Sequence, residues 1–366
     1  MRFSRIGIVF TGRPSVKYGM FAYRSLESAL TRNGCAVAYY IGLDLGGTNI
    51  KAGVVDDTGH VMSRASVATG AQGGPEVVVE AMADAAHQVA NEAALDMSRV
   101  AAVGIGAPGP LDIESGRIED APNMPGWANI ALRDQVSQAL GRPAVLENDA
   151  NAAAFSEFWV GAGRDPDISD LIMLTLGTGI GSGIVVGGKI MHGKFGRGGE
   201  VGHMMVEPNG RSCGCGQKGC LEAYASASRT GQRAIEAVQQ MRKGQTSKLR
   251  EIYEHNNQTL SAKDVFDAAK ASDGLAVQIV EKTALYLSIA CVNLCRIFDP
   301  QLIVFAGGMI LAGPYLFDLI HRSFEQQTWS VASSSVRIVP AQLGNSAGFI
   351  GAAGIAWEAD RTGRFS

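Results

Sequence analysis

The stretch YYIGLDLGGTNIKAGVVD at residues 39–56 decides the fold, together with a later stretch of the same pattern, LIMLTLGTGIGSGIVV at residues 171–186. In each, an apolar segment of strand-like composition runs into a turn rich in glycine and threonine, and a second apolar segment follows. This pattern predicts a β-hairpin. Because the two hairpins lie in two halves of the chain, we expect two related subdomains that face one another.

The turns of both hairpins are suited to binding phosphate, because glycine lets backbone N–H groups approach phosphate oxygens. Asp44, just before the first turn, is placed to hold Mg²⁺ directly or through water. A third glycine loop after the strand-like QLIVFA offers close approach to a nucleoside. Taken alone, the first hairpin is equally well explained as plain turn chemistry beside a buried aspartate. The loop residues are Gly46, Gly47, Thr48, Asn49, Gly177, Thr178, Gly179, Gly307 and Gly308.

Helices and strands alternate along the rest of the chain, which favours an α/β fold. We expect helices near residues 74–94, 132–140, 223–243, 261–271, 274–298, 314–326 and 345–361. The segments VAAVGIGA, PAVLEND, QLIVFAGG and VRIVPAQL are expected to be strands. The segment GAAGIA in the closing helix contains mostly small residues, which suit close packing. Residues 1–38, with a short strand IGIVF and a helix from about residue 16 to 31, are expected to be an extension of unknown role.

Asp149 is the best-placed candidate for a general base. The buried strand PAVLEND ends in Asn148 and Asp149, and an alanine-rich helix starts at once. Polar residues where a strand opens onto a helix are where α/β folds place their chemistry. A carboxylate there can take the proton of an acceptor hydroxyl in phosphoryl transfer. The alternative is that Asp149 only caps the helix N-terminus.

The stretch EVGHMMVEPNGRSCGCGQKGCLE at residues 200–222 predicts a loop that is held together by a bound zinc ion. His203, Cys213, Cys215 and Cys220 supply one imidazole and three thiols, which is the ligand set of a closed structural zinc site. The alternative is a thiol set that happens to be close. The remaining histidines stand alone and are expected at the surface or in the core rather than as ligands, namely His60, His87, His192, His255 and His321.

Two carboxylates, Glu200 and Glu222, bracket this loop. Held rigidly, they are good acceptors for sugar hydroxyls. With Asn148 and Asp149 they would make a neutral-to-acidic pocket for a polyhydroxylated, uncharged substrate. The alternative is a pair of surface salt bridges.

Composition narrows the class of protein. With 366 residues, 46% hydrophobic and 18% charged, the chain has room for two domains. A net charge of −3 and no Lys/Arg run disfavour nucleic-acid binding. Six cysteines are too few for a disulfide framework, which favours a reducing cytoplasm. No apolar run reaches the ~18 to 20 residues needed to span a bilayer, so we expect no membrane association.

The chain resembles the ROK (repressor, open reading frame, kinase) sugar kinases over about residues 39–357. The resemblance rests on LDLGGTNIKAGVVD, GIGAPGP, ENDANAAAFSE, LTLGTGIGSGIV, GEVGHM with CGCGQKGCLEAYAS, and IVFAGG. It implies a two-domain actin-like ATPase (ribonuclease H-like) fold, with a mixed sheet in each domain and a sugar/ATP cleft between them. The small domain would comprise residues 39–150 and 345–366, and the large one residues 151–344.

The resemblance also implies residue roles. Asp149 matches the catalytic base, and Asn148, Glu200, His203 and Glu222 match sugar contacts, with His203 binding zinc through its other ring nitrogen. The cysteines of residues 213–220 match the zinc thiolates. The glycine loops match the phosphate-facing and adenosine-facing segments.

The implied activity is ATP-dependent phosphorylation of a hexose, with glucose as the first expectation. Kinases for N-acetylmannosamine, N-acetylglucosamine or fructose, and polyphosphate-dependent glucose kinases, share these motifs. A sugar sensor or repressor without turnover is the alternative of a different class. Repressors of this family carry a helix-turn-helix domain of many tens of residues, whereas only 38 residues precede the first hairpin. The family also suggests dimers or tetramers.

Overall fold

The computed structural model of the chain describes residues 31–32, 35–120, 126–328 and 335–365. It divides into two units, Met1–Val37 and Ala38–Ser366. In the first unit, β1 (Thr31–Arg32) pairs antiparallel with β2 (Cys35–Ala36). The strand and helix expected before residue 31 lie outside the described residues, and Thr31 itself is in a strand rather than a helix.

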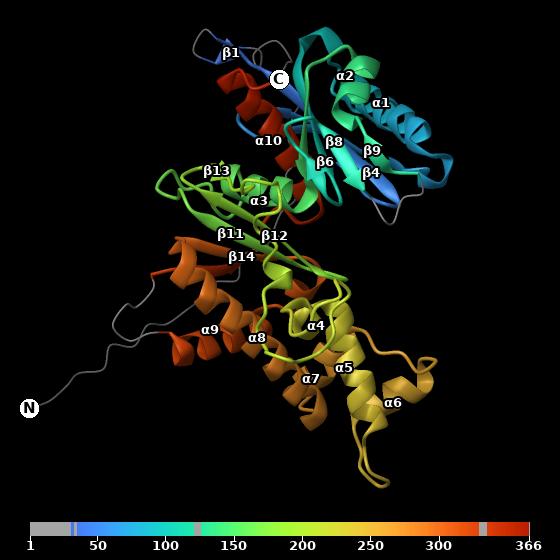
Figure 1. Cartoon of the computed structure of the whole chain (residues 1–366), viewed down its shortest axis with the longest axis vertical. Helices are drawn as coiled ribbons and strands as arrows, with labels where there is room; N and C mark the ends of the chain where they lie inside the picture. The colour runs from blue at the N-terminus through green and yellow to red at the C-terminus, as the bar shows by residue number, and fades with distance from the viewer. Residues whose placement is uncertain (1–30, 33–34, 121–125, 329–334, 366) are drawn as a thin grey trace, which may run out of the picture. The chain divides into compact units, whose positions relative to one another are not determined.

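The first large sheet is mixed and has the strand order β10-β6-β3-β4-β5. The strand β3 runs antiparallel to β4 and parallel to β6, which in turn runs parallel to β10. The expected first hairpin is therefore confirmed, and β5 adds a third antiparallel strand. The strands are β3 (Tyr39–Leu45), β4 (Asn49–Asp56), β5 (Val61–Ala68), β6 (Val100–Ala107) and β10 (Ala144–Asn148). The helices α1 (Pro75–Glu92) and α2 (Leu132–Leu140) cover one face (Figure 1).

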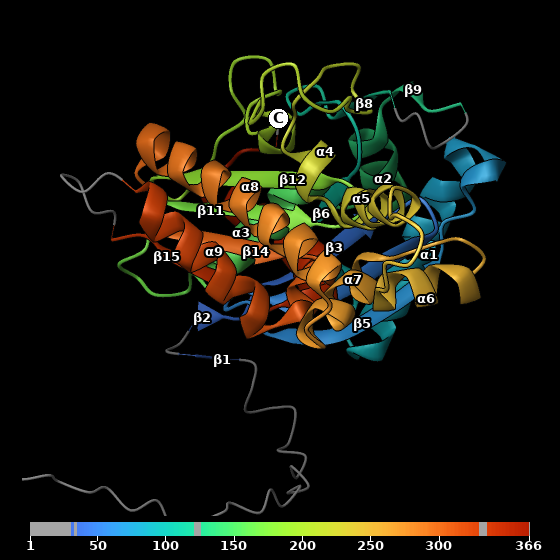
Figure 2. The ribbon, with the colours of Figure 1, turned by 90° about the horizontal axis from the view of Figure 1, so that it is seen from below.

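The second large sheet repeats this arrangement with the order β13-β12-β11-β14-β15. Again an antiparallel hairpin, β11 with β12, is followed by parallel strands, β14 and β15. The strands are β11 (Leu171–Leu176), β12 (Ile180–Val186), β13 (Lys189–Ile190), β14 (Leu302–Ala306) and β15 (Arg337–Pro340). The long helices α8 (Gly274–Phe298) and α9 (Pro314–Gln327) cover its outer face (Figure 2).

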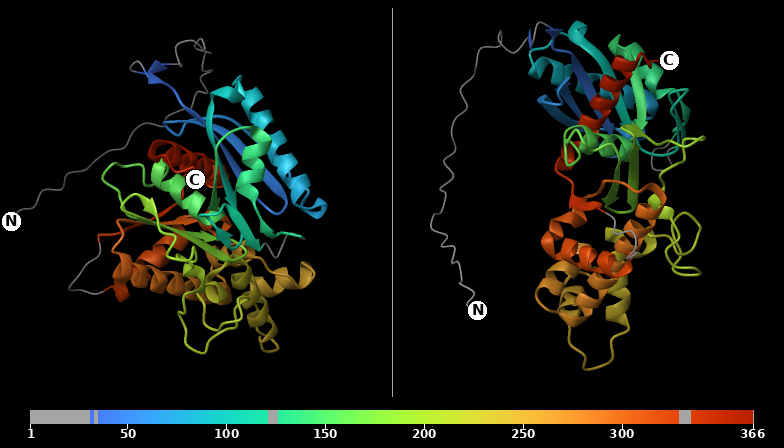
Figure 3. Two further views of the ribbon diagram at one scale, coloured as in Figure 1. Left: turned by 45° about the horizontal axis from the view of Figure 1, so that its top comes forward. Right: turned by 90° about the vertical axis from the view of Figure 1, so that its left-hand side faces the viewer.

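Two helices, α3 (Asp149–Trp159) and α10 (Ala347–Thr362), lie between the sheets (Figures 1 and 3). A Cβ added to Gly104 of β6 would lie 1.7 Å from Ala352 O of α10, and one added to Gly351 would lie 1.7 Å from Ala152 O of α3. Such contacts require glycine, because a side chain would overlap the neighbouring backbone. The close packing expected of the small residues in the closing helix is thus confirmed.

The helical region after the cysteine stretch differs from the expected pattern. The helix expected over residues 223–243 is split into α4 (Glu222–Ala225) and α5 (Ala227–Gln239). The split occurs because the Ser226 side chain accepts the backbone N–H of Arg229 and starts a new helix. The helix α6 (Lys248–His255) was not expected, and α7 (Ala262–Lys270) was.

Short elements complete the described part of the chain. The strands β7 (Leu111–Asp112), β8 (Arg117–Asp120) and β9 (Ala128–Ile130) form a small antiparallel sheet. Single-turn 3-10 helices lie at Ala71–Gly73, Met97–Arg99, Val201–His203, Gly308–Ala312 and Gly344–Ser346. The expected boundary between a small and a large domain remains a prediction.

The helix α8 corrects one expectation. The sequence was expected to contain no apolar run long enough to span a bilayer, but by length and composition α8 could cross one, with a mean hydropathy of 1.5 over its most apolar window. In the structure 61% of that window is buried. Its burial against the second sheet is typical of a core helix in a soluble protein.

Candidate active site

The turn from β10 into α3 presents Asn148 and Asp149. Asn148 is the N-cap residue: its Oδ1 accepts the backbone N–H groups of Ala150 at 2.9 Å and Asn151 at 3.3 Å. The N-cap residue of α3 is therefore Asn148 and not Asp149, although Asp149 Oδ1 also accepts the N–H of Ala150. Because Oδ1 of Asn148 is committed to the helix, its Nδ2 is the group that remains for a ligand.

Asp149 stands in an environment that disfavours its charge. Its pKa is raised to about 6, mainly by burial. The nearby carboxylates of Asp44 and Glu200 contribute to this rise, and the backbone N–H of Ala150, which Asp149 accepts at 2.8 Å, opposes it. The structure thus brings together three of the acidic residues that the sequence singled out. A carboxylate with a pKa near neutrality can accept a proton and later release it.

Asp44 lies at the end of β3, where it meets the start of α10. Burial raises the pKa of its carboxyl group, and Lys51, whose Nζ lies 3.8 Å away, opposes this rise. A Cβ added to Gly348 would lie 2.4 Å from Asp44 Oδ2. The glycine therefore leaves room for the carboxylate.

The glycine loops lie at the carboxyl ends of parallel strands. Gly46 closes the first turn by donating its N–H to Asn49 O at 3.0 Å, and Gly47, Thr48 and Asn49 are exposed. In the second sheet, Thr175 of β11 pairs with Ala306 of β14. The loops at 177–179 and 307–308 are therefore neighbours.

Close backbone contact explains one glycine of the third loop. Gly307 has φ +87°, and a Cβ there would lie 2.6 Å from Leu176 O. Its left-handed conformation and this approach both favour glycine.

Glu200 is held on the opposite side of the site by Ser182 of β12. The Ser182 hydroxyl donates to Gly199 O and accepts the backbone N–H of Val201 at 3.0 Å. These two contacts fix the backbone on both sides of Glu200, whose side chain is exposed to the cleft. Sequence reasoning singled out Glu200 but missed Ser182.

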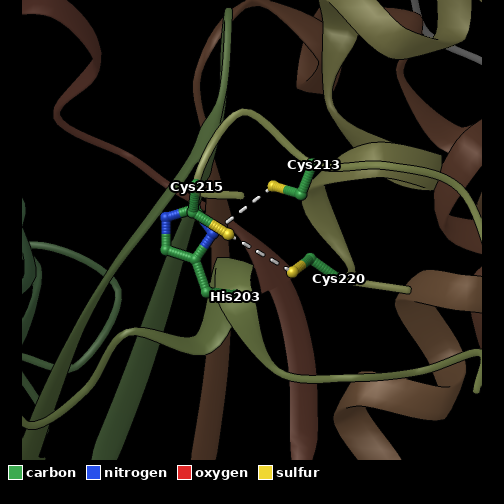
Figure 4. A group of neighbouring side chains, drawn as sticks. All are labelled: His203, Cys213, Cys215 and Cys220. Carbon is green, nitrogen blue, oxygen red and sulfur yellow. Dashed lines mark hydrogen bonds between the residues drawn. The ribbon is translucent and has the colours of Figure 1, made fainter. Parts of the chain in front are cut away.

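The four expected metal ligands converge (Figure 4). The ligand atoms of His203, Cys213, Cys215 and Cys220 lie within 4.8 Å of one another. Cys215 Sγ lies 3.7 Å from Cys220 Sγ, and Cys213 Sγ lies 3.6 Å from His203 Nδ1. Thiolates bound to one zinc ion at about 2.3 Å stand roughly 3.8 Å apart along the edge of a tetrahedron. The spacing and the donor set therefore fit a tetrahedral zinc ion.

Glu222 links the cysteine loop to the second glycine loop. Its Oε2 accepts the backbone N–H of Ile180 at 3.0 Å, and its Oε1 lies 3.5 Å from Cys213 Sγ. A Cβ on Gly179 would lie 2.4 Å from Glu222 Oε2. Glu222 is thus close to the 177–179 loop as well as to the ligand cluster.

A cleft of about 890 Å³ opens beside these residues. Asn148, Glu200 and Cys215 line it, whereas Asp149, His203 and Glu222 are not among its lining residues. Two further polar lining residues, Glu147 and His192, were not singled out from the sequence as residues of the site. Their side chains are joined by a contact of 2.6 Å between Glu147 Oε2 and His192 Nε2. Glu147 precedes the Asn148–Asp149 pair directly, which was the available signal in the sequence.

Comparisons with known proteins show similarity to sugar kinases over most of the chain. A glucokinase from Halalkalibacterium halodurans is 37% identical over 314 residues, which cover 86% of this chain and 93% of that protein. A ROK hexokinase structure from Thermus thermophilus is 35% identical, with a TM-score of 0.74, and the match covers 88% of this chain and 99% of that one.

A ROK family glucokinase from Streptomyces griseus, solved in complex with glucose and AMPPNP, is 34% identical with a TM-score of 0.70. The match covers 88% of this chain and 100% of that one. The two mixed sheets with their repeated hairpins are accordingly those of the two-domain actin-like ATPase fold. Residues 40–359 match the ROK family, and with relatives this similar over nearly their whole length, the chain belongs to that family.

Proposed function

We propose that the protein is an ATP-dependent hexose kinase that converts glucose to glucose 6-phosphate. The observation that carries this proposal is Asp149, a carboxylate with a pKa of about 6 at the end of β10. Proton acceptance by such a group is what attack by a sugar hydroxyl requires. The similarity to glucokinases over most of the chain supports glucose as the acceptor and ATP as the donor.

In the proposed mechanism, the sugar 6-hydroxyl gives its proton to Asp149 as its oxygen bonds to the γ-phosphorus of ATP. The bond from that phosphorus to the bridging oxygen breaks, and ADP leaves. Asn148, Glu200, His203 and Glu222 hold the sugar hydroxyls, which fixes the attacking oxygen near Asp149.

The glycine loops at 46–49 and 177–179 offer N–H groups to the phosphates, and the 307–308 loop contacts adenosine. Asp44 would hold Mg²⁺ directly or through water, and this ion would neutralise phosphate charge.

We assign His203, Cys213, Cys215 and Cys220 to a structural zinc ion. With four protein ligands such an ion would have no open position for a reacting water, so its role would be structural. It would hold His203 and the two ends of the loop in place. A cytoplasmic location and a homo-oligomeric state, dimer or tetramer, belong to the same proposal.

The proposal is tested by measuring ADP release from ATP with a panel of sugars: glucose, fructose, N-acetylglucosamine and N-acetylmannosamine. We expect the highest kcat/KM with glucose. Replacing ATP by polyphosphate tests the donor. A preference for one of the other sugars would correct the substrate but retain the kinase. Saturable sugar binding without ADP from any of them would identify a sensor and overturn the proposal.

A further inference from the structure

The buried carboxylate of Glu147, two residues before the proposed base Asp149, makes hydrogen bonds to several parts of the chain. Its residue is only 2% exposed. Its Oε1 accepts the backbone N–H of Asn148 at 2.8 Å and the side-chain amide of Asn151 at 2.9 Å. The first donor belongs to the N-cap residue at the end of β10 and the second to the first turn of α3, so the carboxylate ties together the two sides of Asp149.

The other oxygen of Glu147 faces the second half of the molecule. Oε2 lies 2.6 Å from Nε2 of His192, which follows β13 of the second sheet. The hydrogen bond to Glu147 raises the pKa of His192, which favours the protonated ring. His192 O accepts the N–H of Gly198 at 2.9 Å. The segment that carries His192 therefore folds back and continues directly into Glu200.

The Glu147–His192 pair also lies between two hollows in the surface. Glu147 and His192 line both the 890 Å³ cleft and a separate hollow of about 260 Å³. The His192 side chain is 34% exposed, whereas that of Glu147 is 3% exposed. The histidine is thus the accessible member of the pair, and the carboxylate is the member that needs a partner, because an unpaired buried charge is strongly unfavourable.

We propose that Glu147 and His192 are positioning residues that tie the turn presenting Asp149 to the segment presenting Glu200. Neither residue has to touch the reacting atoms. His192 satisfies the second oxygen of Glu147, and Glu147 then holds Asn148 and Asn151. This inference rests on the proposed kinase function, because it assigns the pair to the alignment of base and sugar in that reaction.

The test compares His192→Ala, His192→Gln, Glu147→Gln and the double variant Glu147→Gln/His192→Ala. Gln at position 192 can put an amide N–H near the place of the histidine Nε2, so it is the conservative variant. His87→Ala on α1 is the matched control, because His87 is exposed and has no hydrogen bond or ion pair within the described part of the chain. Steady-state rates with glucose and ATP are measured, with thermal melting as a check of the fold.

For His192→Ala we expect kcat with glucose to fall by roughly 10- to 100-fold, since small misplacements of reacting groups cost this much. The KM for ATP should stay unchanged. His192→Gln should recover most of the loss, and the double variant should be no slower than the slower single variant, because the two residues act through one contact. His87→Ala should match the wild type.

Wild-type kcat in His192→Ala would overturn the proposal. So would a folded His192→Gln as slow as His192→Ala, or losses that multiply in the double variant. If His192→Ala does not fold, the kcat values of His192→Gln and Glu147→Gln are compared instead, and they decide whether the pair has a positioning role. A wild-type protein without ADP release from any sugar would instead overturn the proposed function, and the positioning role with it. If the wild type turns over glucose and His192→Ala has the same kcat, the kinase function stands and only the positioning role is overturned.

Discussion

Asn148 and Asp149 are adjacent, yet the structure separates their tasks. Asn148 gives its side-chain oxygen to the start of α3. Asp149 is left with its charge in a buried position near Asp44 and Glu200, which raises its pKa to about 6. A helix N-terminus favours negative charge, so this rise occurs against the helix dipole. The charge on Asp149 is therefore costly to the folded protein and useful to the proposed reaction.

The pH dependence of catalysis follows from this pKa. Asp149 accepts a proton only when it is ionised, so kcat/KM for glucose should rise as pH increases through about 6 and then level off. The measurement is the rate at limiting glucose with MgATP held saturating at each pH, since kcat/KM reports the free enzyme. A profile that stays flat down to about pH 5 would contradict Asp149 as the base.

Replacing Asp149 by Asn should separate activity from stability. We expect kcat to fall by roughly 10²- to 10⁴-fold, because the general base is lost. The raised pKa means that the folded state favours the protonated carboxyl group. The stabilising effect of that protonation is complete below the unfolded pKa of about 3.8 and is lost as pH rises through about 6.

Asp149→Asn, which is never charged, should therefore be more stable than the wild type above pH 6, by on the order of 1–3 kcal/mol, and similar to it near pH 4. Urea unfolding at both pH values tests this, with Asp84→Asn on the exposed side of α1 as the control. A variant that is less stable than the wild type at neutral pH would contradict the account of Asp149.

At the scale of elements, the loop from Glu200 to Glu222 shows what local sequence can predict. The spacing of its histidine and cysteines predicted a ligand cluster, and the four ligand atoms do lie together. The roles of the loop carboxylates depend on contacts that spacing does not reveal. Glu222 reaches Ile180, which is 42 residues earlier, and Glu200 is held through Ser182.

The same limit applies to the residues that sequence reasoning missed. Glu147 and His192 are 45 residues apart and meet only because two separate sheets come together. The break between α4 and α5 depends on one serine side chain turning back to the backbone. Glycine turns and apolar periodicity are local signals, and they predicted most strands and helices. Pairing between distant polar side chains is not a local signal.

Loss of the metal should weaken sugar binding more than the binding of ATP. We expect about one zinc ion per chain in the purified protein and much less in Cys215→Ser. The KM for glucose in that variant should rise on the order of tenfold or more, because His203 and the ends of the loop lose their anchor. Metal analysis and steady-state kinetics measure both effects.

Cys291→Ala is the control for the cysteine variant. Cys291 is buried in α8, outside the ligand cluster, so its replacement should leave the zinc content unchanged. A metal-free protein with normal glucose kinetics would refute the structural role of zinc.

At the scale of the whole unit Ala38–Ser366, the chain passes between the two sheets at more than one place. One connection leads from α3 to β11, and another leads from β15 back to α10. Glu157 of α3 joins these two connections, and its side chain is fully buried. Its Oε2 accepts the N–H of Ala162 at 2.9 Å, and its Oε1 accepts those of Gln342 at 2.9 Å and Leu343 at 2.8 Å. One carboxylate therefore binds both segments through which the sheets are linked.

Removing this carboxylate should destabilise the unit. Glu157→Ala removes a fully buried carboxylate and leaves the N–H groups of Ala162, Gln342 and Leu343 without this acceptor. We therefore expect a loss on the order of 3 kcal/mol in the free energy of unfolding. Glu157→Gln should lose less, because its amide oxygen still accepts while its NH₂ group faces a donor. The midpoint of urea unfolding gives both values, and Glu325→Gln, at an exposed position of α9, is the control.

The same variants also test function. The two connections determine how the first sheet is oriented toward the second. Asp149 follows a strand of the first sheet, and Glu200 is held by a strand of the second. We expect Glu157→Gln to lower kcat/KM for glucose even at temperatures where it is fully folded. Near-normal kinetics in a destabilised Glu157→Gln would limit Glu157 to stability. Stability equal to that of Glu325→Gln would contradict its role as the link between the connections. Because its partners lie 185 and 186 residues further along the chain, only the folded structure brings this carboxylate and these backbone groups together.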